Sequence, residues 1–197
     1  MCGRFVQNSI SYETRTQLGS DYGQFEFEGL GEVFPSQSLD LLLWKNHSLQ
    51  QQTAQWGKAV EGLARPVINA RLETLYEKPL FRGVQPALVV ANAWVEWRQE
   101  VGGKRAFQFR SDNLLSMAAV VWQDAAATQQ FAIVTCRANS AVRPYHHRMP
   151  LLLSSENIEA WRYWALIEQS SKPCPLTVSE FVSTASRLKD DRQQNLF

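Results

Sequence analysis

Short runs of apolar and β-branched residues, separated by polar or glycine-bearing turns, predict that this chain folds mainly into β-strands. The clearest pair is residues 39–44 and 49–56, which the polar residues 45–48 join as a hairpin. A glycine pair between residues 88–97 and 105–110 predicts a second hairpin. Three later runs are also expected to be strands: residues 114–122, 131–136 and 149–153.

Helices are fewer in the predicted pattern. Residues 156–168 are the clearest helix, with an acidic first turn and an apolar face that carries Ile158, Trp161 and Ala165. A short helix is also expected at residues 11–18, whereas residues 177–180 can begin a helix or form a strand. Because the strands outnumber the helices and do not alternate strictly with them, we expect an α+β fold whose mainly antiparallel sheet curls into a barrel-like core.

Length and charge limit the classes of protein that fit. The 197 residues are within the usual size of one domain, so we expect residues 1–197 to form a single unit. The chain has 20 Lys and Arg against 19 Asp and Glu, and this balance does not indicate a nucleic-acid-binding protein. Any DNA-binding surface must therefore be local.

The three cysteines are Cys2, Cys136 and Cys174, which are widely separated and include no C-x-x-C pair. This spacing argues against a disulfide framework and against a zinc site, and a reducing cytoplasm fits it best. No apolar stretch approaches the roughly 20 residues of a membrane span, and no secretory signal is visible. We expect a soluble cytoplasmic protein that needs no metal or other cofactor.

Cys2 is the first residue with candidate chemistry. A small residue after the initiator generally allows removal of Met1, and the free α-amine of Cys2 would then have a pKa of about 7.7–8.0 and its thiol one of about 8.5. Such a 1,2-aminothiol can condense with an aldehyde to a Schiff base and then close a thiazolidine ring. Arg4, two residues along an extended segment, can favour the neutral amine or hold an anionic substrate. The alternative is that the cysteine is at this position by chance, as it is in many chains.

Glu96 is the carboxylate whose position is most unusual. It ends an apolar run, and Trp94 lies on the same side of the expected strand. Desolvation there would raise its pKa and let it hold and deliver a proton near neutral pH. The alternative is a glutamate at a strand end that pairs with Arg98 or is solvated.

Two further segments carry groups suited to a reaction centre. His146 and His147 are adjacent, so in an extended chain at most one of them enters a given pocket and the two are not a metal pair. Asn69 and Arg71 share a face if their segment is extended, and they offer an amide and a guanidinium to a sugar or a phosphate. For each segment, a surface turn or cap is the alternative.

Together these segments resemble the SRAP family, the SOS response-associated peptidase domains that act on abasic sites in DNA. The matches are ordered along nearly the whole chain, and the most specific are Met1-Cys2-Gly3-Arg4, Ile68-Asn69-Ala70-Arg71-Leu72-Glu73, Trp94-Val95-Glu96-Trp97 and His146-His147-Arg148-Met149-Pro150. The chain departs from the family pattern at Glu32-Val33-Phe34-Pro35, where Asn usually precedes the proline motif.

The resemblance implies a curled, mostly antiparallel sheet with flanking helices and a positively charged cleft for single-stranded DNA. It implies that Met1 is removed and that Cys2 forms a thiazolidine cross-link with the ring-opened abasic aldehyde. By position, Asn69, Glu96 and His146 match the other active-site groups, and His146 is selected over His147. The expected DNA-binding residues are Arg4, Arg71, Trp56 and Arg148.

The sequence is therefore compatible with three functions. The first is covalent capture of abasic sites in single-stranded DNA by a monomer, with base stacking on rings such as Trp56, Trp94 or Phe34. The second is an N-terminal-cysteine hydrolase or an autopeptidase that cleaves the bond between Met1 and Cys2. The third is a non-covalent module for single-stranded DNA in which the cysteine is incidental.

Overall fold

The computed structural model describes residues 2–10, 25–123, 128–164 and 175–183. The elements in chain order are β1 (Phe5–Gln7), β2 (Gly31–Val33), β3 (Ser38–Lys45), β4 (Ser48–Trp56), β5 (Asn69–Arg71), the 3-10 helices η3 (Leu72–Thr74) and η4 (Pro79–Phe81), β6 (Gln85–Glu100), β7 (Gly103–Val121), β8 (Gln130–Arg137), β9 (Arg148–Pro150), α2 (Ser155–Arg162) and β10 (Thr177–Glu180).

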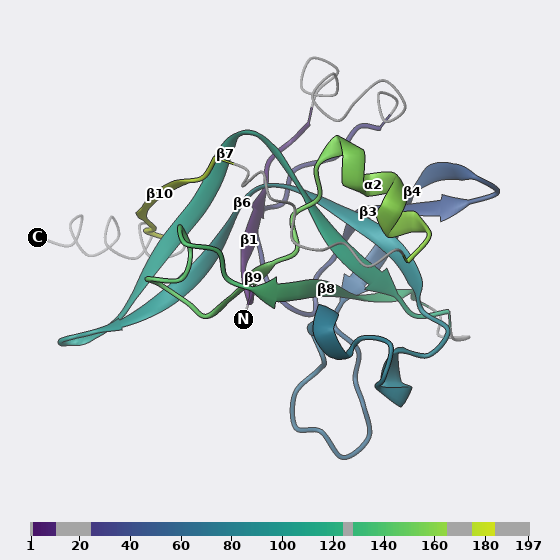
Figure 1. The fold of residues 1–197 in the computed structure, drawn as a ribbon, viewed down its shortest axis with the longest axis horizontal. Helices are drawn as coiled ribbons and strands as arrows, with labels where there is room; N and C mark the ends of the chain where they lie inside the picture. The colour runs from purple at the N-terminus through teal and green to yellow at the C-terminus, as the bar shows by residue number, and fades with distance from the viewer. Residues whose placement is uncertain (1, 11–24, 124–127, 165–174, 184–197) are drawn as a thin grey trace, which may run out of the picture.

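The sheet closes on itself as an uneven ring (Figure 1). Its strands follow the order β10-β7-β8-β4-β3-β6-β1-β2. The additional pairing of β6 with β7 closes the ring, which consists of β7, β8, β4, β3 and β6. Most pairings are antiparallel, as the sequence predicted, but β8 pairs in parallel with both β4 and β5. The parallel pairing puts Asn69 of β5 opposite Ile133 of β8 and so brings β5 onto the ring.

Both predicted hairpins are confirmed. β3 and β4 pair from Ser38–Gln55 to Lys45–Ser48, and the turn residues Asn46 and His47 both have positive φ, as a two-residue hairpin loop requires. In the second hairpin the outgoing strand is longer than expected. Residues 105–110 and 114–122 were predicted as two strands, but residues 105–110 and 114–121 lie in the single strand β7, because β6 pairs with it along nearly its whole length.

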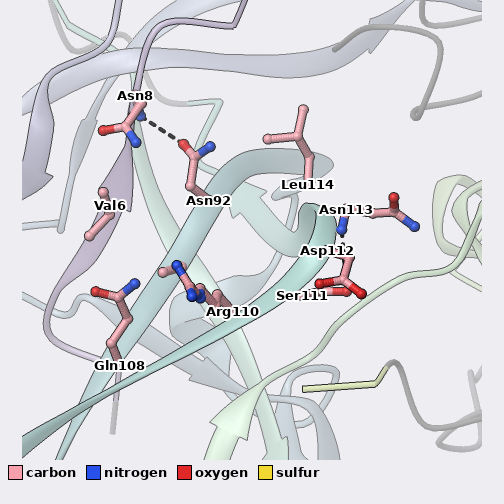
Figure 2. A pocket seen from close by; sticks show the side chains of 10 residues that line it. Val6, Asn8, Asn92, Gln108, Arg110, Ser111, Asp112, Asn113 and Leu114 are labelled. Carbon is pink, nitrogen blue, oxygen red and sulfur yellow. Dashed lines mark hydrogen bonds between the residues drawn. The ribbon is translucent and has the colours of Figure 1, made fainter. Parts of the chain in front are cut away.

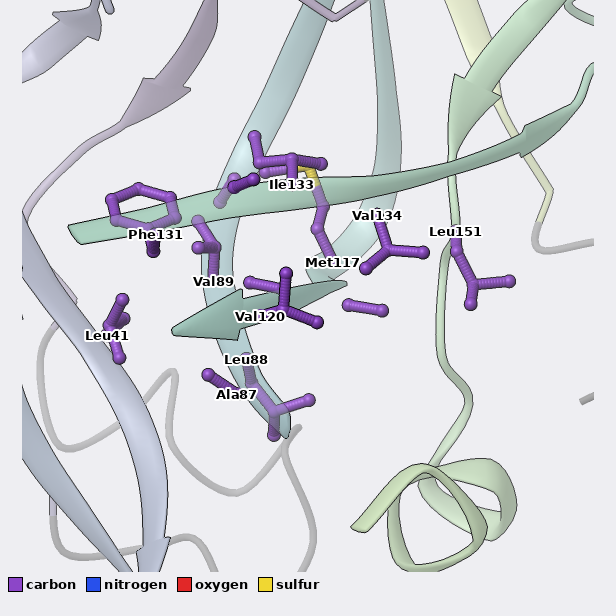
Figure 3. Close-up of a cluster of buried hydrophobic side chains, with 14 of the residues drawn as sticks. Leu41, Ala87, Leu88, Val89, Met117, Val120, Phe131, Ile133, Val134 and Leu151 are labelled. Carbon is purple, nitrogen blue, oxygen red and sulfur yellow. The ribbon is translucent and has the colours of Figure 1, made fainter. Parts of the chain in front are cut away.

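The core fills the interior of the ring. Leu41, Leu88, Val120, Phe131 and Ile133 come from four different strands, and each has 2% or less of its surface exposed (Figure 3). All five belong to one cluster of buried hydrophobic residues. Residues of this type each contribute roughly 1.5–3 kcal/mol when they are fully buried.

The helix predictions have mixed outcomes. The helix predicted at 156–168 corresponds to α2, which is shorter because it ends at Arg162. Ile158 and Trp161 of its predicted apolar face are buried. The indole of Trp161 donates a hydrogen bond to the carbonyl oxygen of Ala87 at 3.0 Å, which fixes α2 to β6. Residues 177–180 form a strand, because the edge of β7 offers them antiparallel partners. The helix predicted at 11–18 lies outside the described residues.

Candidate active site

Cys2 lies at the meeting point of β1, β5 and β6. Asn69, the first residue of β5, donates a hydrogen bond from its side-chain Nδ2 to the carbonyl oxygen of Cys2 at 2.8 Å. The next residue but one, Arg4, accepts a hydrogen bond on its carbonyl oxygen from the backbone N–H of Val95 at 2.9 Å. The N-terminal segment is therefore held on both sides before β1 begins.

The side chain of Cys2 is fully buried, with its Sγ 3.8 Å from the carbonyl oxygen of Arg4. Burial raises the pKa of the Cys2 thiol well above its ordinary value, and the nearby Glu96 carboxylate raises it further. The thiol is therefore protonated at neutral pH and needs a proton acceptor before it can attack an electrophile.

Glu96 projects from β6 into this buried region and has 1% of its surface exposed. Burial raises the pKa of Glu96 from its ordinary 4.5 to about 7, as the apolar surroundings in the sequence predicted. Trp94 lies on the same side of β6 and is also fully buried. Arg98, the partner considered from the sequence, instead pairs with Glu100. A carboxyl group that titrates near pH 7 is suited to both giving and taking a proton.

His146 approaches Glu96 from the segment before β9. Its Nδ1 lies 3.8 Å from Oε2 of Glu96 and 3.0 Å from both the backbone nitrogen and the carbonyl oxygen of Arg148. The backbone of Arg148 can therefore bond to this nitrogen whether or not it carries a proton. Burial lowers the pKa of the His146 imidazole, so the ring is neutral at pH 7. His147 is exposed, whereas His146 is partly buried.

Arg148 does not have the position expected for a DNA-binding residue. The residue is 7% exposed, and its guanidinium donates to both carboxylate oxygens of Glu73, at 2.6 and 2.8 Å. It also donates to the carbonyl oxygen of Thr135 at 2.6 Å. The prediction that Arg148 contacts a DNA phosphate is therefore wrong, because its guanidinium forms an internal ion pair with Glu73. The contacts with Glu73 and Thr135 hold the segment of His146 against η3 and β8.

The prediction that Trp56 binds DNA is also wrong. Its side chain has no exposed surface, its indole donates to the carbonyl oxygen of Ile68 at 2.9 Å, and it packs between Phe5 and Phe131. Trp94 is buried in the same way and stacks on Phe109 with ring centroids 4.9 Å apart. Neither ring can stack on a DNA base, because both belong to the core.

Arg4 lies on the opposite side of β1 from the core, between two half-buried rings. Its guanidinium lies 4.6 Å from the ring centroid of Phe34 and 5.2 Å from that of Trp97. Its Nη1 is also 3.4 Å from Oε2 of Glu32, the residue at which the chain departs from the family pattern. Trp97 was not among the predicted DNA-binding residues, although its place next to Glu96 on a strand was a signal that it faces the other way.

The remaining predicted residue, Arg71, is exposed at the end of β5. Within the described residues, no group of three or more His, Cys, Asp or Glu side chains is arranged to hold a metal ion. In the same part of the chain, no helix is long and apolar enough to cross a membrane.

Comparisons with known proteins agree on one family. A family model described as SOS response associated peptidase (SRAP) matches residues 1–179. The abasic site processing protein YedK of Escherichia coli is 28% identical over 175 residues, which cover 82% of this chain and 79% of that protein. The abasic site processing protein YoqW of Bacillus subtilis is 27% identical over 180 residues, which cover 82% and 80%.

Solved structures share the fold. A phage-related protein from Bordetella bronchiseptica superposes with a TM-score of 0.72 at 22% identity. The superposition covers 92% of this chain and 95% of the Bordetella chain. A protein from Bacteroides thetaiotaomicron superposes with a TM-score of 0.68 at 19% identity, with coverage of 92% and 93%.

Proposed function

We propose a function from one premise: the chain belongs to the SOS response associated peptidase (SRAP) family. The relatives named above are abasic site processing proteins. We infer that this chain also processes abasic sites in DNA, and that it captures the lesion covalently through Cys2 once Met1 has been removed. The observation that carries the proposal is the position of Cys2, whose carbonyl is bonded by Asn69 and whose thiol lies in the field of the Glu96 carboxylate.

The proposed reaction begins with the ring-opened aldehyde of an abasic site. The neutral α-amine of Cys2 adds to the aldehyde carbon, and a proton moves from nitrogen to oxygen to give a carbinolamine. Protonated Glu96 then delivers its proton to the hydroxyl group, which leaves as water and forms an iminium ion. A Glu96 pKa of about 7 suits this step, because a substantial fraction of the group holds a proton at neutral pH.

Ring closure uses the same carboxyl group in reverse. The Glu96 carboxylate takes the proton of the Cys2 thiol, and the thiolate adds to the iminium carbon to close a thiazolidine ring. One water is lost overall, and Glu96 ends the cycle protonated. This order of steps overcomes the raised pKa of the buried thiol, because the proton acceptor becomes charged only when the electrophile has formed.

His146 and Asn69 have separate roles in this proposal. Neutral His146 exchanges a proton with the deoxyribose oxygen during ring opening and during reversal of the cross-link. Asn69 acts as a positioning residue, because its hydrogen bond to the Cys2 carbonyl orients the backbone that carries the amine. Exposed Arg71 and the guanidinium of Arg4 contact phosphates beside the lesion.

Base stacking is assigned to Phe34, which was expected from the sequence, and to Trp97, which replaces the buried Trp56 and Trp94. Trp97 and Phe34 flank Arg4 and are partly exposed, so we propose that they contact the sugars and bases next to the abasic site. A guanidinium between two rings is held in place before DNA binds, which lowers the entropic cost of the phosphate contact.

The experiment is a gel assay for a heat-stable adduct. Purified chain that begins with Cys2 is incubated with single-stranded DNA that contains one abasic site. A shifted band with the native chain and none with Cys2→Ala supports covalent capture. No band with either chain excludes it, and cleavage of glutamine or peptide substrates without an adduct favours the hydrolase alternative.

A further inference from the structure

A hollow of about 310 Å³ opens where β7 departs from β6 (Figure 2). Ala91 pairs with Leu115 and Ala93 pairs with Arg110, so the four residues 111–114 of β7 face the single residue Asn92. Irregularities of this kind often lie next to functional sites, because they redirect side chains that a regular ladder would hold apart. Its volume is at the lower end of the usual range for sites that bind small ligands.

The hollow is preformed. The carboxamide oxygen Oδ1 of Asn92 accepts a hydrogen bond from the backbone N–H of Asn8 at 2.7 Å, as the dashed line in Figure 2 shows. The buried side chain of Gln7 donates to the carbonyl oxygen of Val90 at 2.8 Å. These two bonds fix the end of β1 against β6, so the part of the wall that these two strands form is held in place before a ligand binds.

The lining combines an apolar surface with many hydrogen-bonding groups. Val6, Ala93 and Leu114 supply the apolar part. The polar side chains are those of Asn8, Asn92, Gln108, Arg110, Ser111, Asp112 and Asn113. Arg110 and Asp112 are both exposed, and neither has an ion-pair partner among the described residues. Their formal charges cancel, so the hollow is better matched to a neutral group with donors and acceptors than to a phosphate.

The hollow continues the side of the sheet on which Arg4 lies. Arg4 and Val6 are two residues apart on the same side of β1, a step of about 7 Å. Val95, whose N–H bonds to the Arg4 carbonyl, pairs with Gln108 of the lining. A DNA strand that contacts Arg4 and Trp97 therefore reaches the hollow within one or two nucleotides.

We propose that this hollow binds an unpaired nucleobase of the same DNA strand, close to the lesion. The base edge is hydrogen-bonded by Arg110, Asp112 and Gln108, and its face rests on Val6 and Leu114. The inference rests on the proposed function, and it adds a contact that selects the sequence around the abasic site. A guanidinium with a carboxylate and amides is a set that can distinguish bases by their donor and acceptor pattern.

The test removes single bases from the DNA. Single-stranded oligonucleotides carry an unreactive tetrahydrofuran abasic analogue at the lesion position and a second one at each flanking position in turn. We expect one flanking position at which loss of the base weakens binding by the native chain roughly tenfold. In Arg110→Ala and in Gln108→Ala, removal of the base at that position should change binding by less than about twofold.

Arg82→Ala is the matched control, because Arg82 is exposed near the other end of β6 and loses the same charge. It should keep the full sensitivity to the missing base. The proposal is overturned if no flanking base matters to the native chain, or if Arg110→Ala weakens binding equally for every oligonucleotide, which is the behaviour of a phosphate contact. Adduct formation by the native chain at a reactive abasic site is measured in parallel. It persists if only this inference is wrong, and it is absent if the proposed function itself is wrong.

Discussion

Oε2 of Glu96 and Nδ1 of His146 are 3.8 Å apart, and the two groups reach this position from β6 and from the segment before β9, which are far apart in the sequence. Burial shifts their pKa values in opposite directions, because it disfavours the charged form of each group. At neutral pH the pair therefore contains a carboxyl group that exchanges its proton readily and an imidazole that is neutral. This combination can move protons in both directions of a reversible condensation.

Replacement of the carboxyl group tests its role in adduct formation. Glu96→Gln keeps the shape of the side chain but cannot exchange a proton, so we expect the cross-linking rate at pH 7 to fall by about 100-fold. In the native chain the rate should also change with an apparent pKa near 7, and this inflection should be absent from the variant. Single-turnover rates measured from pH 5.5 to pH 8.5 check both expectations, and equal rates in the two chains would remove Glu96 from the mechanism.

The raised pKa of Glu96 also predicts a dependence of stability on pH. Because the folded-state pKa of about 7 exceeds the ordinary 4.5, the folded chain binds more protons than the unfolded chain between these values. The stability from this group is present at low pH and is lost as pH rises through 7, with a loss on the order of 3 kcal/mol.

Urea denaturation at pH 5 and pH 8 measures this effect. Glu96→Gln should gain stability relative to the native chain between the two values, whereas Glu77→Gln, which alters an exposed carboxyl group, should follow the native chain. A parallel change in all three proteins contradicts the assignment.

His146 is expected to matter more for reversal than for formation. His146→Ala should slow release of the cross-link by about 100-fold and slow formation by less than about tenfold, because protonation of the sugar oxygen is needed to reopen the adduct. Release is measured by transfer of the protein to an excess of a second abasic oligonucleotide. His147→Ala is the control, since its side chain is exposed and is not assigned a role. Equal slowing of both directions would argue against this division.

Truncation of Trp56 should mainly lower the stability of the fold, whereas truncation of Trp97 should mainly weaken DNA binding. Trp56→Ala removes a fully buried ring and its hydrogen bond to Ile68, and should cost about 3–5 kcal/mol of unfolding free energy. Trp97→Ala should cost less than about 1.5 kcal/mol but weaken binding of single-stranded DNA by about tenfold. Denaturant unfolding and fluorescence anisotropy measure the two quantities. Weakened DNA binding by a folded Trp56→Phe chain would restore the expectation that Trp56 contacts DNA.

Much of the fold could be predicted from local patterns. The hairpin of β3 and β4 was predictable because the apolar run of β3 ends in a polar turn, so both signals lie within a few residues of each other. The parallel pairings of β8 with β4 and β5 were not predictable in this way. They join segments more than sixty residues apart, and no periodicity within one segment specifies a distant partner.

The candidate site was predictable where a residue type and its strand position carried the signal. Glu96 was identified by an apolar run that predicted its desolvation, and the structure confirms its burial. Trp56 and Arg148 were misassigned, because an exposed ring and a core ring are alike in sequence, and a buried arginine is recognised only from its partner Glu73. The hollow beside Asn92 depends on the register between two strands, which sequence alone does not specify.

The most direct test of covalent capture is the intact mass of the protein after reaction with a short single-stranded oligonucleotide that contains one abasic site. We expect that the native chain begins with Cys2 and that its product weighs the sum of protein and DNA less one water, with the cross-link located on the N-terminal peptide. Cys2→Ala should give no heat-stable product. A heat-stable product from Cys2→Ala that also weighs the sum of protein and DNA less one water would contradict covalent capture through Cys2. A cross-link located on any other residue would contradict it as well.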